Sequence, residues 1–241
     1  MLSRNQIAVV TGASSGIGKA IALGLAAQEA TLCLVGRKLD KLQTVADKAR
    51  ATSPRVMCYQ TDLSVDNDLQ KLTIDLKRAF AHIDLLVHSA GTISMGPLET
   101  ASVEDLDRQY RTNVRAPYVL TQALLPMIKS HHGQIVFINS SAAVDAKAGL
   151  GQYAASKCAL RAIAGSLRDE VNADGVRVLN VFPGRTSTPM QAAVYEIEGK
   201  PYQPELLMQP EDVAAIVINA LNLPRTAEVT DIFIRPLTKS Y

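Results

Sequence analysis

Strand-like and helix-like segments alternate along the whole of this chain, and that alternation limits the possible fold more than any other feature. The strand-like segments are short, nearly continuous apolar runs, which is typical of parallel strands covered on both faces. Their alternation with helices predicts right-handed βαβ units and a doubly wound α/β sheet. Because no repeat, low-complexity tract or linker divides the sequence, residues 1–241 are expected to form a single domain.

The expected elements follow from hydrophobic spacing and from turn residues. Strands are expected at residues 7–11, 31–35, 55–59, 83–87, 134–139, 176–182 and 229–234. Helices are expected at residues 17–29, 39–51, 66–81, 103–124 (ending near Pro126), 152–171 and 210–221. Residues 191–207 are expected to be an irregular excursion, and such excursions above parallel strands often cover a site. A substrate loop is therefore expected near residues 190–207, with Tyr195 and Tyr202 lining a pocket.

Composition excludes several classes of protein. A net charge of +2 with no dense Lys/Arg block argues against nucleic-acid binding. No apolar run of about 18 residues occurs, so neither a membrane-spanning helix nor membrane binding is expected. The three cysteines lack C-x-x-C spacing, so no metal is expected. Cysteines without a secretion signal indicate a reducing compartment, so the protein is expected to be cytoplasmic.

A glycine-rich segment, Thr11–Gly18, follows the first expected strand directly. Its glycines allow a sharp turn and a close approach to a pyrophosphate, and the first-turn amides of the next helix would face that anion. The spacing is G-x-x-x-G-x-G rather than G-x-G-x-x-G, and Lys19-Ala20 lacks the hydroxyl that a Walker loop requires. The position after a strand favours a dinucleotide-phosphate loop over a plain glycine-rich turn.

The residues after the second expected strand indicate which dinucleotide binds. A carboxylate here would accept a hydrogen bond from the adenosine ribose 2′-hydroxyl and would repel a 2′-phosphate. The chain instead has Gly36-Arg37-Lys38, with no acidic residue before Asp40. Arg37 is suited to a forked pair with a phosphate, and Lys38 adds positive charge. NADP(H) is therefore favoured, the alternative being a basic pair that faces solvent.

Tyr153 and Lys157 lie four residues apart on an expected helix, so both project from one face. A free phenol has a pKa of about 10, and a nearby ammonium lowers it. Reaching about 7 requires roughly 4 kcal/mol, which a close cation and an oxidised nicotinamide in a partly desolvated cleft are expected to supply. The preceding strand ends at Asn139-Ser140-Ser141, and hydroxyls at the carboxyl end of a parallel strand lie where ligands bind.

With these motifs the sequence resembles the short-chain dehydrogenase/reductase family, in its single-domain form, over essentially the whole chain. The family's T-G-x-x-x-G-x-G motif is matched by Thr11, Gly12, Gly16 and Gly18, and its Y-x-x-x-K motif by Tyr153 and Lys157. The resemblance implies a Rossmann fold with a seven-stranded, mostly parallel sheet and helices on both faces. It also implies a hydride transfer between a nicotinamide and a substrate carbon.

The resemblance implies a role for each of four catalytic residues. Tyr153 would exchange a proton with the substrate oxygen, and Ser141 would hydrogen-bond and orient that oxygen. Lys157 would grip the nicotinamide ribose and lower the tyrosine pKa. Asn113, in a Thr-Asn-Val context, would hold a water that links Lys157 to solvent.

The resemblance also implies a cofactor site. Asp62 would contact the adenine, Pro183-Gly184 would pack on the nicotinamide, and Thr188 would reach its carboxamide. The full expected set is Gly12, Ser14, Ser15, Gly16, Ile17, Gly18, Arg37, Asp62, Leu63, Ser89, Ala90, Gly91, Tyr153, Lys157, Pro183, Gly184, Thr186 and Thr188.

The sequence departs from the family pattern in three ways. His88-Ser89 replaces the usual Asn-Asn before Ala-Gly, and His88 is expected to be a packed residue at a strand end rather than a chemical group. The gap from Ser141 to Tyr153 is one residue shorter than the family's. Ser140 would restore the gap, but Ser141 better fits the strand-end pattern and is preferred. Thr186 replaces a valine whose backbone is expected to make the contact.

The sequence therefore predicts an NADP(H)-dependent oxidoreductase that interconverts a carbonyl and a secondary alcohol of a small molecule. A 3-oxoacyl-thioester reductase of lipid synthesis and a non-catalytic NADP(H)-sensing regulator are the alternatives, and a methyltransferase is disfavoured by Arg37. A homodimer or homotetramer is expected from the resemblance. The substrate itself is not readable from the sequence.

Overall fold

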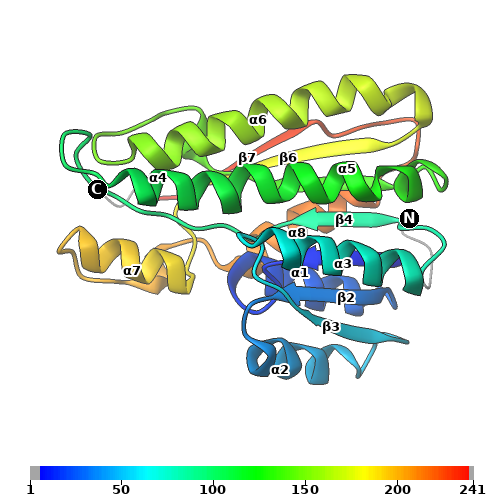
Figure 1. The fold of residues 1–241 in the computed structure, drawn as a ribbon. Helices are drawn as coiled ribbons and strands as arrows, with labels where there is room; N and C mark the ends of the chain where they lie inside the picture. Colours follow the sequence, from blue (N-terminus) through cyan, green and yellow to red (C-terminus); the bar gives the residue numbers. More distant parts are fainter. Residues whose placement is uncertain (1–5, 239–241) are drawn as a thin grey trace.

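Seven parallel strands form one sheet in the order β3-β2-β1-β4-β5-β6-β7, as the computed structural model shows for residues 6–238 (Figure 1). The strands are β1 (Ile7–Thr11), β2 (Thr31–Gly36), β3 (Val56–Gln60), β4 (Leu85–His88), β5 (Gln134–Ile138), β6 (Arg177–Pro183) and β7 (Asp231–Ile234). The order reverses between β1 and β4, and in such sheets ligands bind beyond the carboxyl ends of the strands at this reversal. The expected doubly wound Rossmann fold is confirmed.

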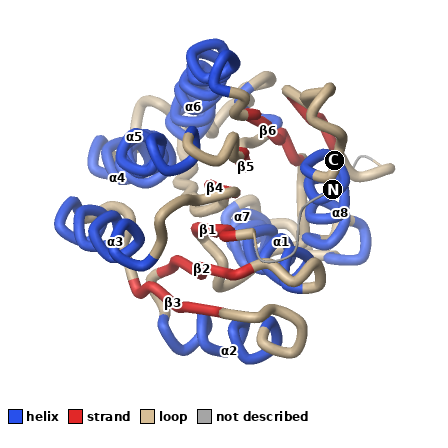
Figure 2. Tube along the Cα trace, turned by 90° about the vertical axis from the view of Figure 1, so that its right-hand side faces the viewer, coloured by secondary structure: helices blue, strands red, loops and turns tan. Residues whose placement is uncertain are grey.

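Helices cover both faces of the sheet (Figure 2). The longer helices are α1 (Gly16–Ala26), α2 (Leu39–Ala49), α3 (Asp66–Ala79), α4 (Val103–Tyr110), α5 (Ala116–Lys129), α6 (Gly151–Val171), α7 (Pro189–Ile197) and α8 (Pro210–Leu221). One core lies under α1, α2 and α8, and the other lies under α3, α5 and α6. Neighbouring strand residues alternate between them: Val10 belongs to the first core and Val9 to the second. This double burial explains why the strands are apolar at nearly every position.

The helix expected at 103–124 is interrupted. A π-helical turn at Arg111–Arg115 separates α4 from α5, so Asn113 lies where the helical hydrogen bonding changes. The expected end near Pro126 is wrong, because α5 continues to Lys129. Leu124 and Ile128 are fully buried on either side of the proline. Their packing outweighs the one hydrogen bond that proline removes.

The excursion after β6 is more regular than expected. It forms α7 and a 3₁₀ turn at Pro204–Leu206. Its two ends are joined, because Thr186 pairs with Met208 and the Ser187 N–H donates to the Met208 carbonyl at 2.8 Å. Within residues 6–238, no helix combines the length and apolarity needed to cross a bilayer.

Candidate active site

The glycine loop after β1 is in contact with the segment after β4. Gly12 has a φ of +67°, and an ideal Cβ on it would lie 2.7 Å from the Ala90 nitrogen. An ideal Cβ on Gly18 would lie 2.5 Å from the Gly12 carbonyl oxygen. Neither position has room for a side chain, because the neighbours are backbone atoms. The spacing of these glycines is therefore set by the close approach of three backbone segments.

Thr11 fixes that approach through its side chain. Its hydroxyl donates to the Val87 carbonyl at 3.3 Å and accepts from the amides of Ser89 at 3.1 Å and Ala90 at 3.2 Å. The carboxyl ends of β1 and β4 are thereby joined by a buried hydroxyl. The sequence motif showed this threonine but not its three partners.

The start of α1 is suited to an anion. Ser15, its N-cap residue, is extended and makes no capping hydrogen bond through its side chain. The first turn contains no acidic residue, so no carboxylate competes for the positive end of the helix dipole. Ser14, Ser15 and Ile17 are half-buried around this helix end.

Basic and acidic side chains meet beyond β2 and β3. Arg37 and Lys38 are exposed after β2. The Asp62 carboxylate accepts hydrogen bonds from the Ser64 amide at 2.9 Å and hydroxyl at 2.7 Å. Partial burial acts to raise the pKa of Asp62, but these hydrogen bonds and the charge of Arg37 together lower it. The charge of Arg37 is thus near enough to affect Asp62, the residue expected to contact the adenine. Leu63, the next residue after Asp62, is buried.

Tyr153, Lys157 and Asn113 lie together at the same edge of the sheet. The Lys157 ammonium donates to the Ile138 carbonyl at 3.1 Å and lies 5.8 Å from the centre of the Tyr153 ring. The Asn113 amide accepts from the Thr92 amide and donates to its carbonyl, both at 2.9 Å. All three expected catalytic side chains are buried.

Protein groups alone do not make the Tyr153 phenol acidic. Burial raises the pKa of Tyr153, and a hydrogen bond with the Ser140 side chain only partly opposes that effect. Burial also lowers the pKa of Lys157 to about 8. In the protein groups alone, burial disfavours the charged forms of both Tyr153 and Lys157. The expected lowering of the Tyr153 pKa by Lys157 together with an oxidised nicotinamide stays a prediction.

The structure places Ser140, rather than the preferred Ser141, against Tyr153. Ser140 is the last extended residue after β5, with a φ of −160°, and its side chain faces the phenol. Ser141 begins a 3₁₀ turn (Ser141–Ala143), and its side chain is exposed. The geometry favours Ser140 over Ser141, because the turn starts one residue earlier than the strand-end pattern suggested. Which of the two serines acts in catalysis stays a prediction. The family's spacing from Tyr153 was the sequence signal that indicated Ser140.

The remaining residues of the expected cofactor site lie around the same end of the sheet. An ideal Cβ on Gly91 would lie 3.5 Å from Asn113 Oδ1 and 3.8 Å from Lys157 Nζ. The Thr188 methyl lies 3.0 Å from the ideal Cβ position of Gly16, so the start of α7 faces the glycine loop. Farther along, Pro183 ends β6, the Gly184 amide donates to the Ile234 carbonyl at 2.8 Å, and Thr186 is buried.

Comparison with known proteins identifies this arrangement. Residues 6–199 match the family model described as short chain dehydrogenase. The chain belongs to the short-chain dehydrogenase family. A sepiapterin reductase of Chlorobaculum tepidum is 34% identical, with 95% of this chain and 96% of that protein covered.

Solved structures of similar proteins carry nicotinamide cofactors. An alcohol dehydrogenase from Thermococcus sibiricus, complexed with 5-hydroxy-NADP, is 27% identical with a TM-score of 0.89, covering 99% of this chain and 100% of that one. The L-sorbose reductase of Gluconobacter frateurii, complexed with NADPH and L-sorbose, is 27% identical with a TM-score of 0.88, covering 97% and 96%.

His88, where this short-chain dehydrogenase departs from the usual asparagine, is a packed residue as expected. Its Nε2 lies 2.8 Å from the Thr121 hydroxyl, and its ring stacks on Phe137 at 4.9 Å between centroids. Burial lowers the pKa of His88 to about 3. The ring is therefore held neutral and takes no proton from a ligand near neutral pH.

Acid is expected to destabilise the protein through His88. The unfolded chain binds the extra proton below pH 6.5 and the folded chain only near pH 3, so stability falls as the pH drops through this range. Between pH 7 and pH 5 the loss is about 2 kcal/mol. Urea unfolding at both pH values should show a loss smaller by about that amount in His88→Asn. Equal losses in both proteins would contradict the assignment.

Tyr195 and Tyr202, expected to line a pocket, contact each other and their neighbours within the excursion. Their rings meet edge to face at 5.5 Å, and the Arg185 guanidinium lies 4.8 Å from the Tyr195 ring centre. The Tyr202 hydroxyl is 3.0 Å from the Ser187 hydroxyl. Met190, which the sequence did not single out, reaches the site: its methyl lies 4.0 Å from the ideal Cβ position of Gly91.

Proposed function

We propose that this short-chain dehydrogenase is an NADP(H)-dependent oxidoreductase that interconverts a carbonyl and a secondary alcohol, with Tyr153 as the acid/base. The observation that carries the proposal is the position of buried Lys157 beside Gly91, with the buried Tyr153 ring next to Lys157. Gly91 follows β4, where the chain contacts the glycine loop and the strand order reverses. Similar structures contain NADP or NADPH, which supports the cofactor.

The residues present fit a dinucleotide. Gly12 and Gly18 let the loop pack tightly where a side chain would clash with backbone. The uncapped start of α1 offers its amides to a pyrophosphate. Arg37 would bind the 2′-phosphate, and Asp62 would contact the adenine. When bound, NADPH supplies the hydride for the substrate carbon. Lys157 would hold the nicotinamide ribose through its ammonium.

The proton chemistry belongs to the chain itself. Because the pKa of Tyr153 is raised by burial, its hydroxyl is protonated at neutral pH, as a proton donor to a substrate oxygen must be. Ser140, whose hydroxyl has one proton to donate, would hydrogen-bond to that oxygen as Tyr153 gives up its proton. Asn113, held by Thr92, would position a water between Lys157 and solvent.

Ser140 and Ser141 offer a matched pair for testing this assignment. Ser140→Ala should lower kcat by about 100-fold, because it removes a donor to the reacting oxygen. Ser141→Ala should change kcat by less than about threefold, because an exposed hydroxyl that makes no such contact contributes little. Steady-state kinetics of both variants with the same substrate provide the measurement. The reverse ranking would return the role to Ser141.

Cofactor preference should depend on Arg37. Arg37→Asp is expected to weaken NADPH use by at least about tenfold in kcat/KM, because a charge-assisted hydrogen bond is lost and a repulsive charge is gained. Use of NADH should rise, since the new carboxylate can accept from the ribose hydroxyl. Lys38→Asp is the control at the neighbouring position. Faster turnover with NADH by the unaltered protein would contradict the role of Arg37.

The function as a whole is tested by a panel of carbonyl substrates with NADPH consumption as the readout. The panel should include a pterin ketone, a keto sugar, short ketones and a 3-oxoacyl thioester. Turnover of any carbonyl supports the proposal, and exclusive use of the thioester would identify the narrower reductase. A sensor would instead bind NADPH without turning over any substrate of the panel. Its biological activity would also be retained in Tyr153→Phe. A cytoplasmic location and assembly as a homodimer or homotetramer stay predictions.

A further inference from the structure

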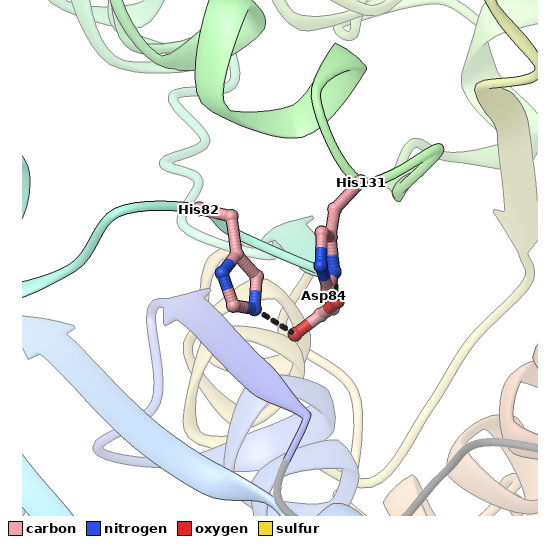
Figure 3. Close-up of side chains that lie close together, drawn as sticks. All are labelled: His82, Asp84 and His131. Carbon is pink, nitrogen blue, oxygen red and sulfur yellow. Dashed lines mark hydrogen bonds and ion pairs between the residues drawn. The ribbon is translucent and has the colours of Figure 1, made fainter.

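A second cluster of chemical groups lies at the opposite end of the sheet from Tyr153. His82 and Asp84 precede β4, and His131 follows α5. One ligand atom from each of the three residues lies within 4.8 Å of those of the other two. Figure 3 shows both imidazole rings directed at the Asp84 carboxylate. The sequence did not single out these residues, because 47 positions separate Asp84 from His131.

Asp84 is held rigidly by the strands around it. Its carboxylate accepts from the Ile7 amide at 2.8 Å, and its own amide donates to the Ile7 carbonyl at 3.0 Å. The Gln134 amide donates to the Asp84 carbonyl at 2.8 Å. The start of β1, the start of β4 and the start of β5 therefore fix this carboxylate, whose side chain is only 11% exposed.

The His82–Asp84 distance matches that of two metal ligands, and His131 is hydrogen-bonded to Asp84 directly, so a bound ion would replace that hydrogen bond. His82 Nε2 lies 3.4 Å from Asp84 Oδ2, and His131 Nδ1 lies 2.9 Å from Asp84 Oδ1. Two ligand atoms in a tetrahedral zinc site lie about 3.4 Å apart, given metal–ligand bonds of about 2.1 Å. The two imidazole rings are stacked, with centroids 3.7 Å apart, so their nitrogen edges reach the same carboxylate.

We propose that His82, Asp84 and His131 form a divalent-metal site suited to Zn²⁺, with water as the remaining ligand. Two neutral imidazoles and one carboxylate are a borderline donor set that suits Zn²⁺ better than Mg²⁺ or Ca²⁺. His82 and His131 are accessible to solvent, so an ion can enter without opening the fold. The bound ion would tie the turn after α5 to the starts of β1 and β4, which is a structural role away from the hydride-transfer site.

The test uses the full-length, tag-free chain after treatment with a chelator. Titration with Co²⁺, followed by visible absorption, and with Zn²⁺, followed by calorimetry, should show one saturable site. His82→Gln and His131→Gln should each weaken binding at least about tenfold. His132→Gln is the matched control, because His132 lies on the same turn but its Nδ1 faces the Asp174 carbonyl at 2.7 Å. The control should bind like the unaltered protein.

Thermal unfolding gives a second readout. Zn²⁺ should raise the unfolding temperature of the unaltered protein and of His132→Gln, but not of His131→Gln, because only a metal bound to the folded state stabilises it. NADPH-linked turnover should be unchanged in His82→Gln, His131→Gln and His132→Gln. Failure of the metal site is therefore distinguishable from failure of the proposed enzyme function. Absence of saturable binding, or binding undiminished in a His82→Gln/His131→Gln double variant, would overturn the metal site.

Discussion

Replacing Tyr153 by phenylalanine is expected to lower kcat by roughly 1,000-fold, which is within the range that a positioned acid/base contributes. The change removes one hydroxyl from a ring that is 9% exposed and leaves the packing of α6 intact. The buried hydroxyl also carries a desolvation cost, so the folded state should lose little stability. Turnover kinetics, NADPH binding by calorimetry and thermal unfolding should be measured on the same preparation.

Tyr118→Phe is the control for that experiment. Tyr118 lies on α5 and is 50% exposed, so removing its hydroxyl should affect neither turnover nor cofactor binding. The expected pattern is loss of kcat in Tyr153→Phe alone, with NADPH affinity preserved in both variants. Residual turnover within about tenfold of the unaltered protein would show that another group supplies the proton.

Gly12→Ala is expected to cost about 2–5 kcal/mol of unfolding free energy. An alanine here must adopt a φ of +67°, which costs about 1–2 kcal/mol. Its Cβ would also lie 2.7 Å from the Ala90 nitrogen and 2.9 Å from the Ser89 carbonyl carbon. Forcing an extra carbon into such a contact costs a further 1–3 kcal/mol or so. Urea unfolding measures the loss, and cofactor titration should show that NADPH affinity falls as the loop moves.

Gly149→Ala separates the two contributions. Gly149 has a φ of +77°, but no atom lies within 4 Å of its ideal Cβ position. This variant should therefore show only the cost of the left-handed backbone, about 1–2 kcal/mol. If the two alanine variants were equally destabilised, the close approach of Gly12 to Ala90 would contribute nothing, and the glycine would be required for its backbone conformation alone.

Features that depend on short-range spacing could be predicted from the sequence. Continuous apolar strands, the glycines after β1 and the four-residue spacing of Tyr153 and Lys157 are local patterns, and the sheet, the loop and the shared helix face follow from them. The packed state of His88 was also predicted correctly, because a histidine at the end of a buried strand has little access to solvent.

Features that depend on where the chain turns were not predicted correctly. The position at which β5 gives way to a 3₁₀ turn decides between Ser140 and Ser141, and a shift of one residue reverses which side chain faces Tyr153. The start of α7 carries a helix signal, Thr188 followed by Pro189, but nearby glycine and proline residues hid it. The burial of Tyr195 follows from the same helix and was not predicted, whereas its role beside a pocket stays a prediction.

Features assembled across the sheet had no signal in the sequence. The triad of His82, Asp84 and His131 exists because parallel strands begin at one edge and bring two distant turns together. The effect of burial on Tyr153 and Lys157 is likewise a property of the packed state. Spacing alone indicated that a cation is near the phenol, but not that burial would act against both charges.

The backbone pairing of Thr186 with Met208 has a consequence for how the substrate range can change. Residues 187–207 begin and end beside this pairing. Contacts within the segment, such as the Ser187 and Tyr202 hydroxyls at 3.0 Å, hold it together. Because both ends are fixed by this pairing, we infer that the length and sequence between them can change while the ends stay in place. We predict that exchanging residues 189–207 between relatives, with Thr188 kept, would alter which substrates the protein accepts.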